Sequence, residues 1–156
     1  MATSRNISPF GYLALIGDTK MSIFLTYAED DTCTYDRVWN INFWDLRALG
    51  LGKRIELIDF SPNCEEFVAV TNTGDFSLWS IKKMKFLRRI SSFRKGREMP
   101  VTALRTFKKN QMCVAFSQPN NLIMIVDLIS QFDIIRIRPE TEGFGKFLSF
   151  QIDHSE

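Results

Sequence analysis

The chain has 156 residues, of which 45% are hydrophobic and 24% charged, and its formal net charge is +2. This length allows a buried core and fits one domain. Apolar runs end long before the roughly 20 residues that a membrane-spanning helix needs, and Met1–Asn6 has no apolar stretch of the signal-peptide type. We therefore expect no membrane association and a place in the nucleus or the cytosol.

The N-terminal third of the chain has an irregular strand pattern. A turn at Ser8-Pro9 precedes the apolar stretch Tyr12–Ile16, and a later apolar stretch occupies Ile41–Leu46. We expect the segment between them, Met21–Trp39, to be a long hairpin insertion. Within it, Met21–Tyr27 has the composition of an additional strand.

The middle of the chain reads as four short strands separated by turns. Pro62 presets the backbone for the first turn, and Gly74 can take the positive φ that a tight hairpin requires. The strands are rich in aromatic and β-branched residues. The predicted strands are Ile55–Phe60, Phe67–Val70, Phe76–Ile81 and Phe86–Ile90.

The same order returns 47 residues later, so that Phe60 corresponds to Phe107 and Gly74 to Asn121. Asn tolerates positive φ better than most residues, which suits a tight turn at this place. The second set of predicted strands is Val101–Phe107, Met112–Ser117, Leu122–Leu128 and Phe132–Ile137.

A four-stranded repeat at this spacing is typical of β-propeller blades, which bury their faces by stacking around an axis. We expect an all-β fold of about three four-stranded antiparallel blades, at residues 7–54, 55–98 and 99–138. Residues 139–156 would add one strand, at Phe147–Ile152, and a tail. Because closed propellers typically have 4 to 8 blades, the ring is incomplete. The chain is then a fragment, or a partner chain or a second copy completes the ring.

Three tripeptides at the ends of apparent third strands resemble the WD-repeat family, whose prototype strand ends in Trp-Asp. They are Trp44-Asp45-Leu46, Trp79-Ser80-Ile81 and Val126-Asp127-Leu128. The Gly-His pair of a standard repeat is absent. Ser61-Pro62, Phe67–Val70 and Gly74–Trp79, followed by Pro100–Leu104 and Val114–Ser117, resemble the C-terminal propeller of cirhin-type nucleolar proteins. That resemblance implies a role in the processome that assembles the small ribosomal subunit.

Catalytic and metal-binding patterns are missing from the sequence. The single histidine, His154, lies two residues from the C-terminus, and the three cysteines, Cys33, Cys64 and Cys113, are far apart. Neither a nucleophile arrangement nor a zinc site follows from them, and isolated cysteines are typical of free thiols in a reducing compartment. We expect no enzymatic activity, no cofactor and no metal. Trp39, Trp44 and Trp79 are expected in the blade core.

Charge is divided unequally along the chain. Residues 1–81 hold six basic and eleven acidic residues, whereas residues 82–156 hold fourteen basic and seven acidic ones. The basic excess is concentrated at residues 82–109. The candidate binding residues there are Lys82, Lys83, Lys85, Arg88, Arg89, Arg94, Lys95, Arg97, Lys108 and Lys109, and Arg105 extends the same stretch.

Three interpretations of this basic stretch remain open. It docks an acidic protein, it neutralises phosphates of RNA through backbone contacts, or it is a solvated surface whose charges prevent pairing of strand edges. The leading hypothesis is a scaffold for protein–protein interactions inside a ribonucleoprotein assembly, in the nucleus and there in the nucleolus. Direct RNA binding and a cytoplasmic location are the alternatives.

Overall fold

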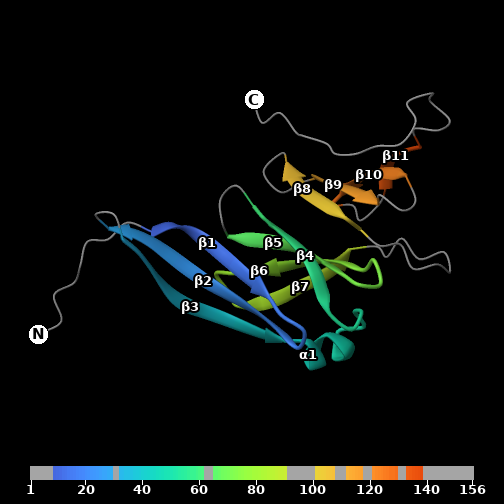
Figure 1. Cartoon of the computed structure of the whole chain (residues 1–156). Coiled ribbons are helices and arrows are strands. Elements are labelled where there is room, and N and C mark those ends of the chain that lie inside the picture. The colour runs from blue at the N-terminus through green and yellow to red at the C-terminus, as the bar shows by residue number, and fades with distance from the viewer. Residues whose placement is uncertain are drawn as a thin grey trace, which may run out of the picture.

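The structure is a computed structural model, and it contains three antiparallel β-sheets placed side by side (Figure 1). One short helix, α1, is the only helix in the part of the chain that is described. The described residues are 9–29, 32–61, 65–90, 101–107, 112–117, 121–129 and 133–138. The expectation of an all-β fold of propeller-like blades is therefore confirmed, with α1 as the one departure among these residues.

The first sheet has three strands within these residues, where the sequence predicted four. Its strands are β1 (Pro9–Ile16), β2 (Lys20–Glu29) and β3 (Thr32–Asn42), in the order β1-β2-β3. The predicted strand at Met21–Tyr27 is confirmed. However, Met21–Trp39 is no insertion, because it supplies most of the two longest strands of the sheet.

The predicted strand at Ile41–Leu46 is wrong beyond residue 42. The chain leaves β3 there and forms α1 (Phe43–Ala48), so Trp44-Asp45-Leu46 belongs to a helix and not to the end of a third strand. One face of α1 is buried through Phe43 and Leu46, while Trp44 points away and is 76% exposed. Trp44 is therefore a surface residue, in contrast to the core position that the sequence predicted.

The other two sheets have four strands each, as predicted. In the second sheet the order is β4-β5-β6-β7, and in the third it is β11-β10-β9-β8. The second sheet consists of β4 (Ile55–Phe60), β5 (Glu66–Thr71), β6 (Phe76–Ser80) and β7 (Lys85–Ile90). The third consists of β8 (Ala103–Phe107), β9 (Met112–Ser117), β10 (Leu122–Asp127) and β11 (Asp133–Ile137).

The two turns singled out in the repeat adopt the backbone conformation that was predicted for them. Gly74, between β5 and β6, has φ +77°, and Asn121, before β10, has φ +45°. Because only glycine, asparagine and a few other residues enter this region at low cost, the repeat preserves the conformation although the residue type changes.

The second sheet is buried on both faces, and alternate residues of its central strands supply the two faces. In β5, Phe67 and Ala69 belong to the core shared with the first sheet, whereas Val68 and Val70 belong to the core shared with the third. All five residues of β6 are buried for the same reason. Because side chains alternate along a strand, an uninterrupted apolar run suits a strand covered on both sides.

Aromatic rings fill the core between the first and second sheets. The rings of Phe67 and Trp79 are stacked, with centroids 6.0 Å apart, and Trp39 of β3 meets Trp79 edge-on at 5.8 Å. The indole N–H of Trp79 donates a hydrogen bond to Ser77 Oγ at 2.8 Å, so its polar atom is paired. Trp79 thus occupies the core as predicted, and Trp39 is partly buried and packs against that core.

Truncating this aromatic core should destabilise the protein far more than truncating α1. We expect Phe67→Ala to lower the free energy of unfolding by about 3–5 kcal/mol, because a fully buried aromatic ring leaves a cavity. Trp44→Ala, the matched control at an exposed aromatic residue, should change it by less than about 1 kcal/mol. Urea denaturation measures both. A large loss for Trp44→Ala would contradict its assignment to the surface.

Candidate functional site

Three predicted binding residues, Lys82, Lys83 and Lys85, lie together at one hairpin. The connection from β6 to β7 covers residues 81–84, and Met84 closes it with φ +47°. Lys82, Lys83 and Lys85 are all exposed. We call these three residues the lysine turn. Its hairpin places positive charge at the outer part of the second sheet, as the sequence predicted.

Arg89 has a structural contact instead of a free surface position. Its guanidinium Nη2 lies 2.5 Å from Asp75 Oδ1, and Asp75 is only 1% exposed. Thr73 Oγ1 donates a hydrogen bond to Asp75 Oδ2 at 2.6 Å, and the Asp75 backbone N–H donates to Thr71 Oγ1 at 3.2 Å. A buried carboxylate needs such partners, so Arg89 compensates the charge of Asp75.

The Thr71 and Thr73 side chains of this cluster also pack closely against the backbone of Gly52, shortly before β4 begins. A Cβ atom at Gly52 would overlap with Thr73 Oγ1 and would lie 2.7 Å from Thr71 Oγ1. Glycine is thus required for the loop after α1 to pass over the β5–β6 turn. The Gly50–Arg54 segment consequently has a packing role.

Arg88, which is partly buried, also has a partner within the protein. Its Nη2 donates a hydrogen bond to the backbone carbonyl of Leu128, which follows β10 of the third sheet. This contact links β7 to the neighbouring sheet, on the opposite side of β7 from the Arg89 contact. Arg88 and Arg89 therefore stabilise the packing, and the lysine turn carries the exposed charge of residues 82–90.

Arg105 lies away from the lysine turn. It belongs to β8 and its Nη1 is 3.6 Å from Asp59 Oδ1 on β4. Since β4 and β7 are the opposite edges of the second sheet, the two groups of cations are separated by the width of that sheet. The stretch 82–109 is not one continuous surface in the described part of the chain.

Asp59 forms a polar link between sheets that the apolar pattern of the inner strands did not indicate. Its Oδ2 accepts hydrogen bonds from the Thr106 backbone N–H at 2.6 Å and from Thr106 Oγ1 at 2.8 Å. Asp59 and Thr106 are 47 residues apart and thus hold the same place in successive repeats. Only the 47-residue period of the sequence indicated that Asp59 and Thr106 would lie close together.

The remaining predicted binding residues cannot be placed. Arg94, Lys95, Arg97, Lys108 and Lys109 lie outside the described residues, as do Phe147–Ile152 and His154.

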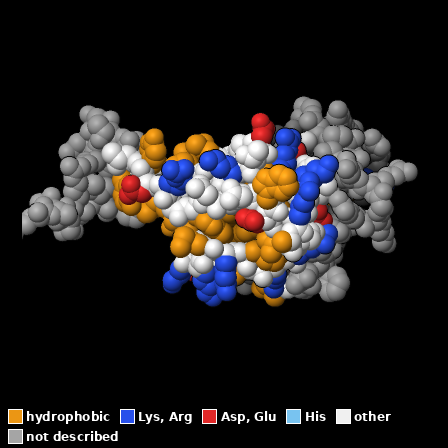
Figure 2. Space-filling model, turned by 90° about the horizontal axis from the view of Figure 1, so that it is seen from below, with side chains coloured by type: hydrophobic (Ala, Val, Ile, Leu, Met, Phe, Trp, Pro, Cys, Tyr) orange, Lys and Arg blue, Asp and Glu red, His pale blue; other side chains and the backbone are white. Residues whose placement is uncertain are grey.

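On the face in Figure 2, Lys and Arg side chains form several separate groups with hydrophobic side chains exposed between them.

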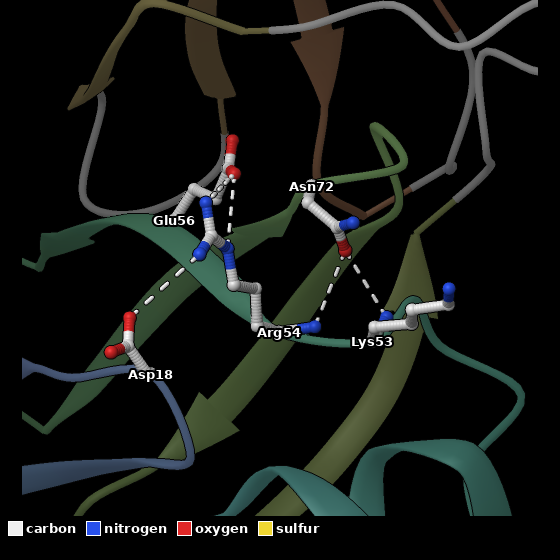
Figure 3. A network of polar contacts seen from close by, with 5 residues as sticks. All are labelled: Asp18, Lys53, Arg54, Glu56 and Asn72. Carbon is white, nitrogen blue, oxygen red and sulfur yellow. Dashed lines mark hydrogen bonds and ion pairs between the residues drawn. The ribbon is translucent and has the colours of Figure 1, made fainter.

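A second polar cluster lies at the end of the molecule where turns of the first and second sheets meet (Figure 3). Arg54 Nη2 is 2.9 Å from Glu56 Oε1, and Arg54 Nη1 is 3.9 Å from Asp18 Oδ1 in the β1–β2 turn. Asn72 Oδ1, in the β5–β6 turn, accepts hydrogen bonds from the backbone N–H groups of Lys53 and Arg54. This network brings both turns to the start of β4.

Exposed aromatic surface occurs beside this cluster, which the sequence analysis missed. The Arg47 guanidinium lies 5.5 Å from the Trp44 ring, and both residues line a shallow hollow with Asp18 and Lys53. Cation–π contacts of this kind are worth roughly 0.5–1 kcal/mol at exposed sites. The sequence predicted a strand here because Trp44-Asp45-Leu46 resembles the end of a WD-repeat strand. The exposed face of α1 was therefore not expected.

A metal site is not assembled by the described residues. They contain no group of three or more His, Cys, Asp or Glu side chains that could hold a metal ion. Among the same residues, no helix is long and apolar enough to cross a membrane.

Charge reversal at Arg89, which is paired with buried Asp75, should affect stability more than charge reversal in the lysine turn. Arg89→Glu places a second carboxylate beside buried Asp75, and we expect it to lower the free energy of unfolding by roughly 1–3 kcal/mol. Lys82→Glu makes the same charge change at an exposed turn and should cost less than about 0.5 kcal/mol. Thermal or urea unfolding compares the two variants. Equal stability would show that the Asp75–Arg89 contact contributes nothing.

Comparison with known proteins gives a fold and no family. No protein-family model and no curated protein sequence matches the chain. Its structure is similar to the crystal structure of the C-terminal WD40 domain of Sif2, with a TM-score of 0.52 and 11% sequence identity. The match covers 85% of this chain and 39% of that chain. The protein thus has the fold of WD40 propeller blades and spans well under half the length of the matched structure.

Proposed function

We propose that the protein is a non-catalytic scaffold that binds an acidic protein partner through the lysine turn. The observation that carries this proposal is the contrast within residues 82–90. Arg88 and Arg89 have internal partners, whereas Lys82, Lys83 and Lys85 project into solvent from one hairpin. Three exposed ammonium groups on one hairpin complement clustered carboxylates and accelerate the encounter with an acidic surface.

The packing of the sheets supports a scaffold. The second sheet is held between two others, with both of its faces buried, so the hairpin is attached to a rigid support. Binding residues on loops that a rigid framework positions lose little conformational freedom when they bind. Function resides in specific sites placed on a fold, and the lysine turn is the exposed charged site on this one.

The assembly that we propose for this scaffold is a ribonucleoprotein in the nucleus. Support comes from the basic excess of residues 82–156 and from the resemblance to cirhin-type proteins. Proteins of such assemblies work next to densely charged RNA, where exposed lysines favour association over long distances. We also propose that protein from outside this chain completes the ring of blades.

Reversing the lysine turn should weaken partner capture without unfolding the protein. We expect Lys82→Glu/Lys83→Glu to lower recovery of protein partners at least several-fold in quantitative affinity purification from nuclear extract. Lys20→Glu/Lys53→Glu is the matched control, because it makes the same charge change at two exposed lysines elsewhere. If both double variants lose the same partners, net charge matters and the lysine turn has no specific role.

Direct RNA binding is distinguished by its dependence on salt. If three lysines neutralise three phosphates, affinity for a single- or double-stranded RNA should fall roughly 20- to 40-fold between 50 and 200 mM salt. Fluorescence anisotropy with a labelled RNA measures this slope for the wild type and for Lys82→Glu/Lys83→Glu. We expect no such RNA binding, so a steep slope that the variant abolishes would favour the RNA alternative over the protein scaffold.

A further inference from the structure

The first sheet corresponds to the last three strands of a four-stranded blade. In the second sheet, β4 is the first strand and β7 the last, and the chain then continues to the first strand of the third sheet. In the first sheet, β3 is the last strand before the chain continues through α1 to β4. Counting back from this link, β3, β2 and β1 correspond to β7, β6 and β5.

Two contacts support this correspondence. The β1–β2 turn and the β5–β6 turn lie at the same end of the molecule, since Asp18 and Asn72 both contact Arg54 (Figure 3). At the other end of β4, Phe60 stacks on Tyr12 of β1 with centroids 6.1 Å apart. β1 therefore runs antiparallel to β4, as β5 does, and it is not an innermost strand.

The place beside β1 that corresponds to β4 holds no strand among the described residues. In the second and third sheets, that place is filled by β4 and β8, which lie next to each other and are joined by the Asp59–Thr106 hydrogen bonds. The first sheet ends at β1 instead. Among the described residues, no strand pairs with the backbone N–H and C=O groups of this inner edge.

The composition of β1 differs from that of every other edge strand in the described part. Natural edge strands carry charged residues that prevent unwanted pairing. The edge strands β3, β4, β7, β8 and β11 each contain at least one Asp, Glu, Lys or Arg. β1 reads Pro-Phe-Gly-Tyr-Leu-Ala-Leu-Ile and contains none. Pro9 and the irregular register between Pro9 and Gly11 interrupt the start of this edge, so the uncharged segment suited to receive a further strand is Gly11–Ile16.

Exposure agrees with this assignment. Leu13 and Leu15 are 46% and 56% exposed, although both belong to an apolar strand. They lie on the face of the first sheet that also carries Phe24 and Tyr35, and these residues line a hollow of about 590 Å³ together with Asp36 and Arg37. A Cβ atom placed on Gly11 would meet nothing within 4 Å. Apolar surface beside an open strand edge offers both parts of a strand-binding site, backbone pairing and side-chain pockets.

We propose that β1 binds an extended strand of another polypeptide, which runs antiparallel to β1 and fills the place that β4 has in the second sheet. The strand presents aliphatic or β-branched residues at alternate positions, because one side faces Leu13 and Leu15 and the other faces the second sheet. This inference deepens the ring completion proposed above, since it assigns a site and a chemistry to the completing chain. It is independent of the lysine turn.

The experiment uses a peptide that copies the strand filling the corresponding place. A fluorescent peptide with the sequence of residues 53–61, which contains β4, is titrated into the full chain and followed by anisotropy. Hydrogen–deuterium exchange then locates the bound peptide. We expect saturable binding and slower exchange in residues 9–16, with unchanged exchange in the charged edge strand β7.

Two variants with matched chemistry test the site. Leu13→Lys/Leu15→Lys introduces charge at the edge and should weaken binding at least about tenfold, which corresponds to roughly 1.4 kcal/mol. Ile129→Lys makes the same kind of change at an aliphatic residue that is 59% exposed outside β1, and it should leave binding unchanged. Lys82→Glu/Lys83→Glu should also bind the peptide normally, which separates this inference from the lysine turn.

Several results would overturn the proposal. Absence of binding, or protection of another strand in place of residues 9–16, would show that β1 does not accept the strand. Dimerisation of the full chain, detected by light scattering and abolished by Leu13→Lys/Leu15→Lys, would assign the edge to a second copy. Peptide binding that appears only in Phe150→Pro would assign it to residues 147–152 of the same chain.

Discussion

The structure depends on the burial of both faces of the second sheet. A single β-sheet cannot exclude water from two apolar faces, so β5 and β6 require a neighbour on each side. The first sheet supplies an aromatic core around Phe67 and Trp79, and the third supplies an aliphatic core around Val68 and Val70. The three sheets therefore stabilise one another, and the second sheet would not be expected to persist alone.

Polar contacts position these layers more specifically than apolar packing can. The carboxylate of Asp59 accepts two hydrogen bonds from Thr106, which sets the offset between neighbouring inner strands. The carboxylate of Asp75 connects the β5–β6 turn to the outer strand β7, because it accepts hydrogen bonds from Thr73 in the turn and from Arg89 in the strand. Because an unpaired buried charge is costly, each link selects one arrangement of the sheets over slipped alternatives.

The distribution of cations follows from these requirements. Two of the five basic residues between positions 82 and 89, Arg88 and Arg89, are used in packing, and the other three form the lysine turn. Arginine suits the positions that have partners within the protein because its planar guanidinium forms directed hydrogen bonds, whereas lysine keeps a well-hydrated charge in solvent. The contrast between charged outer edges and the uncharged edge of β1 follows the same logic, since charge discourages pairing where no strand belongs.

Much of the fold was determined by local sequence. Strands β4 to β11 follow from short apolar runs and from turn residues such as Gly74 and Asn121, whose conformations are decided within a few residues. The 47-residue repeat also predicted stacked four-stranded sheets. Tertiary structure decided the rest. Trp44 resembled the end of a strand, yet the chain turns into α1 because Phe43 and Leu46 find an apolar core there. Likewise, sequence cannot distinguish Arg89 from Lys82, because the carboxylate that neutralises Arg89 is brought to it only when the strands pair.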